Sequence, residues 1–219
     1  MSSARKTYAH LVAHAAKLPI QLTDYEVASW LWPRMQRRFP VALACVLMPD
    51  HLHLLTPTPC EEAARHELAL LIGSMGRSGG ERGRIRFDRI PPCLLDDDPA
   101  KLTRQTRYIA LNPQRAGLVD DPLAWLWSTH RDVVGTVARP WVTADRLAAD
   151  LGRSPDGFAR DWHRYVTRED GVPIAAQTFP VPAAPTSFTA HPLEDVASAV
   201  ARSMRARISS MTSRPQRTP

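Results

Sequence analysis

The chain has 219 residues, of which 44% are hydrophobic and 23% charged, so it has enough apolar material for a packed core and is not disordered throughout. A net charge of +6 and an isoelectric point near 9.7 favour a polyanionic partner such as nucleic acid. We expect a cytoplasmic protein, because there is no signal-peptide pattern and no stretch near the roughly 20 apolar residues of a membrane span. Three widely spaced cysteines imply no disulfide framework: Cys45, Cys60 and Cys93.

The first third of the chain predicts a strand, a helix and then a hairpin. Residues 7–14 have the composition of a strand. A helix is expected from Thr23, which forms a capping-box pattern with Glu26, and Pro33 should kink or shorten it. The apolar run at 41–48 and the segment 51–57 predict two strands joined by a turn at Pro49-Asp50.

The middle of the chain alternates between helical and extended patterns. Residues 61–75 show helical spacing, whereas 85–95 should be extended and lie at a sheet edge because of its two prolines. A helix should begin near Pro99 and stop at Pro113, since the residue before a proline disfavours helical geometry. Shorter helical pieces are expected at 122–134, 144–151 and 155–168.

The end of the chain differs in composition from the rest. Residues 171–192 contain five prolines and almost no charge, which is typical of a linker. Beyond them, residues 193–219 predict an amphipathic helix and a basic tail, with apolar positions at Leu193, Val196, Val200, Met204 and Ile208. We therefore expect a domain over 1–170, a linker over 171–192 and an appended helix and tail over 193–219.

Two short patterns carry chemistry. His51 and His53 lie two apart on a predicted strand, so both imidazoles project from one face and could ligate one divalent metal. Tyr108 and Asn112 lie four apart on a predicted helix, so the hydroxyl and the amide share a face. Taken singly, each pattern is more often structural, because paired histidines and helical tyrosines commonly serve packing.

Together the two blocks resemble a known family. The segment VLMPDHLHLL, followed by YIALNPQRAGLV at 108–119, closely resembles the REP-associated tyrosine transposases. These are relatives of the single-tyrosine transposases of small bacterial insertion sequences, within the HUH nuclease superfamily. The segment WSTH at 127–130 is also similar to a short family motif. The resemblance covers roughly residues 5–170, and Asp50 stands where the family often has asparagine.

The resemblance implies an α+β fold, with a ferredoxin-like antiparallel sheet and helices packed on it. It implies that Tyr108 is the nucleophile and that His51 and His53 are metal ligands, with Asn112 completing the site. The metal would be Mg²⁺ or Mn²⁺, and the partner a single-stranded, REP-like DNA hairpin bound by a monomer or homodimer. Attack by the tyrosine would give a 5′-phosphotyrosine and a free 3′-hydroxyl, which conserves the bond energy for rejoining.

Arginines suit phosphates because they donate two parallel hydrogen bonds. We expect DNA-backbone contacts from the arginines around a glycine-rich loop and from one beyond the tyrosine: Arg77, Arg82, Arg84, Arg86, Arg89 and Arg115. The loop region keeps the family's Arg86-Phe87 pair but lacks its usual tryptophan-glutamine segment. Three functions stay open at this point: an active endonuclease and strand transferase, a non-catalytic hairpin-binding descendant, and an unrelated metal hydrolase or structural domain.

Overall fold

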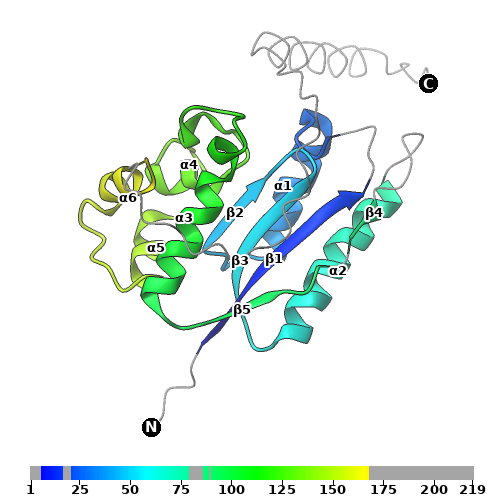
Figure 1. The fold of residues 1–219 in the computed structure, drawn as a ribbon, viewed down its shortest axis with the longest axis horizontal. Helices are drawn as coiled ribbons and strands as arrows, with labels where there is room; N and C mark the ends of the chain where they lie inside the picture. Colours follow the sequence, from blue (N-terminus) through cyan, green and yellow to red (C-terminus); the bar gives the residue numbers. More distant parts are fainter. Residues whose placement is uncertain (1–5, 17–20, 79–85, 89, 168–219) are drawn as a thin grey trace, which may run out of the picture. The chain divides into compact units, whose positions relative to one another are not determined.

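The structure is a computed structural model that describes residues 6–16, 21–78, 86–88 and 90–167. The predicted linker at 171–192 and the tail at 193–219 lie outside these residues, so the expected domain boundaries stay predictions. The described part combines one antiparallel sheet with six α-helices and one 3-10 turn (Figure 1). The predicted α+β class is therefore confirmed.

The sheet is built around its two longest strands. β1 (Thr7–Ala16) pairs antiparallel with β3 (His51–Thr58), and β2 (Ala44–Leu47) pairs with the other edge of β3. The free side of β1 is shared by two short strands, β4 (Arg86–Phe87) near its end and β5 (Cys93–Asp96) near its start. The order across the sheet is thus β2-β3-β1, followed by β4 and β5.

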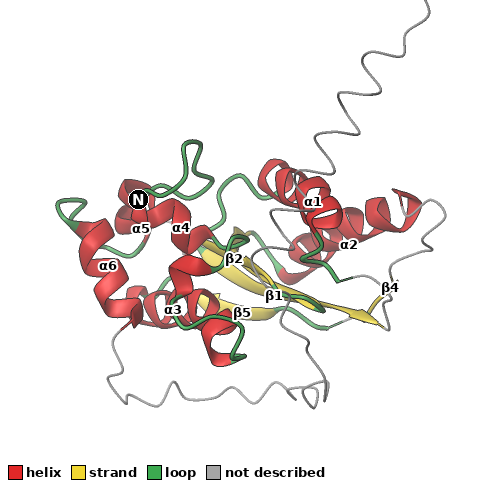
Figure 2. Ribbon diagram, turned by 90° about the horizontal axis from the view of Figure 1, so that it is seen from above, coloured by secondary structure: helices red, strands yellow, loops and turns green. Residues whose placement is uncertain are grey.

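Helices cover both faces of this sheet. Figure 2 shows α1 (Tyr25–Arg38) and α2 (Glu61–Ser78) on one side and α3 (Pro99–Arg115) on the other. The remaining short helices pack around α3 and around one another; they are α4 (Thr129–Val134), α5 (Ala144–Asp150) and α6 (Phe158–Thr167). None of the helices among the described residues combines the length and apolar character needed to cross a bilayer.

Alternation along β1 gives the two faces different chemistry. Ala9, Leu11 and Ala13 are fully buried and belong to the hydrophobic core, which also takes Leu31 and Met35 from α1. Neighbouring positions point the opposite way because successive side chains of a strand alternate. Those positions include His10 and His14, and they lie on the side of the sheet that α3 covers.

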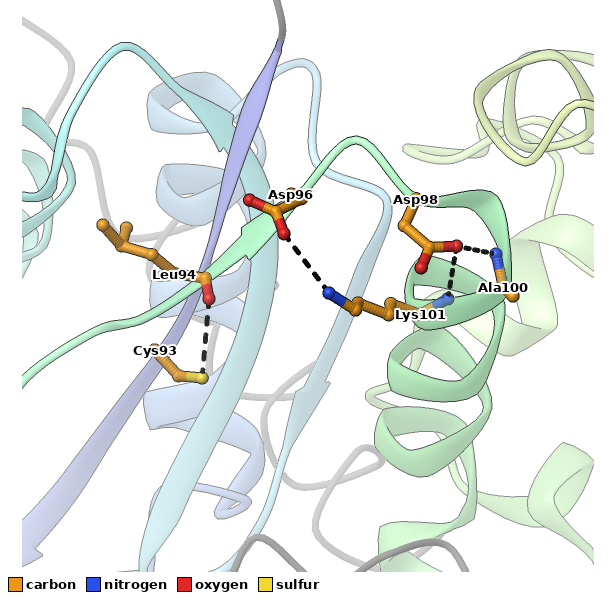
Figure 3. Close-up of polar contacts among 6 residues, drawn as sticks. All are labelled: Cys93, Leu94, Asp96, Asp98, Ala100 and Lys101. Carbon is orange, nitrogen blue, oxygen red and sulfur yellow. Dashed lines mark hydrogen bonds and ion pairs between the residues drawn. The ribbon is translucent and has the colours of Figure 1, made fainter.

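The start of α3 is fixed by a side-chain cap (Figure 3). The carboxylate of Asp98 accepts hydrogen bonds from the backbone N–H groups of Ala100, at 2.8 Å, and Lys101, at 3.3 Å. Lys101 also forms an ion pair with Asp96 at the end of β5, at 3.2 Å. These contacts satisfy otherwise unpaired donors of the first turn and tie the helix to the sheet edge.

The segment around the WSTH motif covers the outer edge of β2. Ser128 forms an isolated antiparallel bridge with Val46, and the Leu47 backbone N–H donates to the Trp127 carbonyl at 2.9 Å. The Thr129 hydroxyl accepts from the Cys45 N–H at 2.8 Å and lies 3.1 Å from the Cys45 carbonyl, to which it donates. An edge strand left open would expose these backbone groups, so the segment completes the sheet. This is why the predicted helical piece at 122–134 is interrupted: it begins as a 3-10 turn at Pro122–Ala124 and resumes only at Thr129.

Two expectations about helix ends are wrong. The N-cap of α1 is Asp24, without a side-chain hydrogen bond to the helix, so the Thr23 capping box does not form. Helix α3 continues through Pro113 to Arg115. Pro113 lies in the last turn, where its missing N–H costs one backbone hydrogen bond, and its ring is buried. The expected strand at 41–48 is also shorter, because only Ala44–Leu47 pair as a strand.

Candidate active site

The face of the sheet beneath α3 carries four histidines. The β1–β3 register places His14 directly opposite His51 and Val12 opposite His53, so both strands turn their histidines to the same side. His10 lies two residues before Val12 on β1, and its ring stacks on His53 with centroids 5.1 Å apart. The rings of His51 and His53 meet edge to face at 4.9 Å. Together they form a continuous imidazole surface.

Three side chains at one end of this surface could hold a cation. Ligand atoms of His14, Asp50 and His51 all lie within 4.8 Å of one another, and each side chain is half-buried. The Asp50 carboxylate lies 2.6 Å from Nδ1 of His51, and this hydrogen bond holds the pKa of Asp50 below its usual range. Burial, and then the neighbouring His51, lower the pKa of His14. Both effects favour the forms that bind metals, a carboxylate and a neutral imidazole.

The other end of the surface is more deeply buried. His10 and His53 are only 1% and 5% exposed, and Nε2 of His10 lies 3.0 Å from Nδ1 of His53. Burial lowers the pKa of His10 to about 4 and takes the pKa of His53 well below its ordinary value. Both rings are therefore neutral at physiological pH, and Nε2 of His53 is the nitrogen that does not face His10.

Tyr108 lies over this buried end. It occupies the middle of α3, and its ring meets His53 edge to face at 5.7 Å and His10 at 6.2 Å. The guanidinium of Arg115, two turns further along the helix, lies 5.6 Å from the centre of the same ring. Tyr108 is only partly buried. The Tyr108 hydroxyl, the imidazole surface and the Arg115 guanidinium thus lie close together.

Asn112 lies one turn beyond Tyr108 and is held by its own helix. Its Nδ2 donates to the Tyr108 carbonyl at 2.9 Å, which orients the amide along α3. The amide oxygen keeps its acceptor capacity.

The structure brings together five of the residues singled out from the sequence: His51, His53, Tyr108, Asn112 and Arg115. Of the loop arginines, Arg82, Arg84 and Arg89 lie outside the described residues, and the side chains of Arg77 and Arg86 do too. Sequence reasoning missed His10 and His14 as part of the site. Their spacing of four on a strand was the available signal, because it puts both on one face.

The chain was compared with known protein families, curated proteins and solved structures. A scan against models of protein families gave no match, and a search of curated proteins gave none either. A search of solved structures found a similar chain. It is a REP-associated tyrosine transposase bound to a REP hairpin, with 20% sequence identity and a TM-score of 0.47, over 64% of this chain and 89% of that chain. Likeness at this level decides nothing about activity or partners, which depend on the residues of the site.

Proposed function

We propose that the chain is a metal-dependent endonuclease and strand transferase for single-stranded DNA, with Tyr108 as its nucleophile. The observation that carries this proposal is the placement of Tyr108 against His53, which in turn adjoins a group of three possible metal ligands. The sequence resemblance supplies the substrate class. We also interpret the sheet, with strand order β2-β3-β1 and β4 and β5 at its edge, as the ferredoxin-like sheet of that family.

The donor set fits a divalent cation. His51 would hold it together with Asp50 and His14, while His53, through Nε2, and Asn112, through its amide oxygen, are further candidate ligands. A mixture of imidazole and carboxylate donors suits Mn²⁺ better than Mg²⁺, which prefers oxygen ligands. When bound, the cation would neutralise the scissile phosphate and act as a Lewis acid.

The chain's own residues would perform the transfer. The Tyr108 hydroxyl oxygen forms a bond to phosphorus while the bond from phosphorus to the 3′ oxygen breaks. The proton that Tyr108 loses balances the proton that the departing 3′ oxygen gains. The products are a 5′-phosphotyrosine and a 3′-hydroxyl, and attack by a 3′-hydroxyl on the phosphotyrosine reverses the step. Arg115, whose guanidinium lies beside the Tyr108 ring, would hold a phosphate oxygen.

The DNA partner would be a hairpin with flanking single strand. The loop arginines, namely Arg77, Arg82, Arg84, Arg86 and Arg89, would contact its backbone. The tail at 193–219 would add a weaker, sequence-independent attachment through the linker at 171–192.

A covalent-adduct assay tests the proposed activity. A hairpin oligonucleotide from the DNA flanking the gene is labelled at its 3′ end, because that fragment would stay on the tyrosine. With Mn²⁺ the wild-type protein should form a labelled protein–DNA adduct, and Tyr108→Phe should form none while still binding the hairpin. Tyr25→Phe is the matched control, because Tyr25 is exposed on α1 and lies outside the histidine group. An adduct in Tyr108→Phe, or an adduct formed equally well in excess chelator, would refute the assignment.

A further inference from the structure

A chain of hydrogen-bonding groups leads from α3 into the buried end of the imidazole surface. Nε2 of Gln105 lies 3.2 Å from Nδ1 of His10, and Nε2 of His10 lies 3.0 Å from Nδ1 of His53. Gln105 precedes Tyr108 by three residues, so it shares the face of the helix that carries the tyrosine. The three groups therefore connect the helix that bears the nucleophile with a candidate metal ligand.

The two histidines cannot choose their protons independently. Nε2 of His10 and Nδ1 of His53 are within hydrogen-bonding distance, and a neutral imidazole carries one N–H and one lone pair. A hydrogen bond between them needs one ring to donate and the other to accept. Once the proton position on His10 is set, the proton position on His53 follows.

Gln105 can set it, because its amide offers a donor at one end and an acceptor at the other. With the NH₂ group toward His10, as in the structure, Nδ1 of His10 accepts and its Nε2 donates to His53. His53 then carries its proton on Nε2 and cannot bind a cation there. With the amide carbonyl toward His10, every hydrogen bond reverses, and Nε2 of His53 has a free lone pair.

We propose that Gln105 and His10 are positioning residues that select the tautomer of His53. The inference rests on the proposed function, since it explains how His53 becomes able to ligate the cation beside Tyr108. A half-turn of the Gln105 amide converts a donating His53 into a ligating one. Each ring keeps one proton throughout, so the net charge of the three groups does not change. Metal ligands of this kind commonly donate their second N–H to a neighbouring acceptor, and His10 supplies that acceptor here.

Two substitutions at Gln105 distinguish the two proton arrangements of the hydrogen-bonded chain formed by Gln105, His10 and His53. Gln105→Glu replaces the amide by a group that only accepts when ionised, so His53 should carry its proton on Nδ1 and leave Nε2 free. Gln105→Leu keeps a similar size and removes both hydrogen-bonding functions, so both tautomers of His53 should be populated. Gln114→Glu controls for added negative charge on α3, because Gln114 is exposed and its amide donates to the Asp120 carbonyl instead.

The first readout is the tautomer itself, measured on the metal-free full-length chain by ¹⁵N chemical shifts of the histidine rings at pH 8. We expect His53 to be an Nδ1–H tautomer in Gln105→Glu, a mixture in Gln105→Leu, and as in wild type in Gln114→Glu. Identical His53 tautomer populations in wild type, Gln105→Glu and Gln105→Leu would overturn the proposal. This measurement needs no catalysis, so it stands even if the chain cleaves no DNA.

The second readout is the affinity for Mn²⁺ by calorimetry, with no DNA present. Gln105→Leu should weaken binding about tenfold, the size of effect seen when the partner of a ligand is removed. Gln105→Glu should bind at least as tightly as wild type and more tightly than Gln114→Glu. Equal affinities for Gln105→Leu and Gln105→Glu would contradict the proposal that Gln105 selects the tautomer of His53. Absence of Mn²⁺ binding in the wild type, by contrast, would count against the proposed metal site.

Discussion

Asp50 supplies the negative charge in the candidate metal group, because its other two members are imidazoles. Asp50→Asn keeps the shape and one oxygen but removes the charge. We expect Mn²⁺ binding to weaken about 10-fold to 100-fold, with the fold unchanged. Calorimetric titration measures this, and Asp145→Asn, in the first turn of α5, is a control for the loss of one carboxylate elsewhere. Equal affinities for the two variants would remove Asp50 from the site.

Among single residues, the shared face of His51 and His53 and that of Tyr108 and Asn112 could be predicted, because each depends only on local periodicity. Residues two apart on a strand, and four apart on a helix, share a face whatever the rest of the chain does. The contribution of His14 could not be read in that way. It depends on the pairing of His14 with His51, a register between segments 37 positions apart that only the folded sheet fixes.

At the scale of elements, the Asp98 cap orients the helix that carries Tyr108. Asp98→Ala removes the acceptor for two backbone N–H groups and should lower the free energy of unfolding by about 1 kcal/mol. Urea denaturation measures the loss. The neighbouring Asp97→Ala is the control, since Asp97 is exposed and does not cap the helix, and it should change the stability little. A larger loss in Asp97→Ala than in Asp98→Ala would contradict this account of the cap.

The contact between Thr129 and Cys45 offers a second test at this scale. Thr129→Val keeps the shape of the side chain but leaves the Cys45 N–H without its buried acceptor, which should cost about 1–3 kcal/mol. Thr129→Ser keeps the hydroxyl and should cost less. Chemical denaturation of both variants gives the comparison. If Thr129→Ser destabilises as much as Thr129→Val, the methyl group and not the hydrogen bond matters at this position.

Element existence was predictable here, whereas some element ends were not. Strand and helix patterns located β1, β3, α2 and α3 correctly. Pro113 was expected to stop α3, but the helix continues to Arg115. Burial of the proline ring offsets the loss of one backbone hydrogen bond. Likewise, the extended residues between Pro122–Ala124 and α4 follow from pairing with β2, a distant partner that no local pattern reveals.

For the molecule as a whole, buried neutral histidines make stability depend on pH. Burial lowers the pKa of His130 to about 4 from an ordinary value of 6.5, so the folded chain binds fewer protons than the unfolded chain between these values. The resulting stability is present above pH 6.5 and is lost as the pH falls toward 4, at about 1.4 kcal/mol per pH unit for each such histidine. His10 acts in the same direction. Asp132 has the opposite effect on stability, because burial raises its pKa to about 6. The folded chain therefore binds this proton first, which stabilises the fold as the pH falls from 6 toward 3.8.

His130→Gln isolates one of these contributions outside the proposed metal site. Between pH 7 and pH 5 the wild type should lose about 2 kcal/mol more unfolding free energy than the variant, because the variant lacks that titrating group. Urea unfolding at the two pH values measures the difference, and the variant's lower stability at pH 7 cancels from the comparison. The same loss in both proteins would mean that His130 is not held neutral by the fold.

The central claim is that the cation and Tyr108 occupy one site, and paramagnetic broadening by Mn²⁺ tests it without any need for catalysis. In protein labelled on its tyrosine rings, substoichiometric Mn²⁺ should broaden the Tyr108 signal first, because its ring adjoins His53 and, through it, His51. Tyr165, on α6, should stay sharp. Asp50→Asn should weaken the effect on Tyr108. A Tyr108 signal that remains sharp while Mn²⁺ binds would separate the metal from the nucleophile and contradict the account.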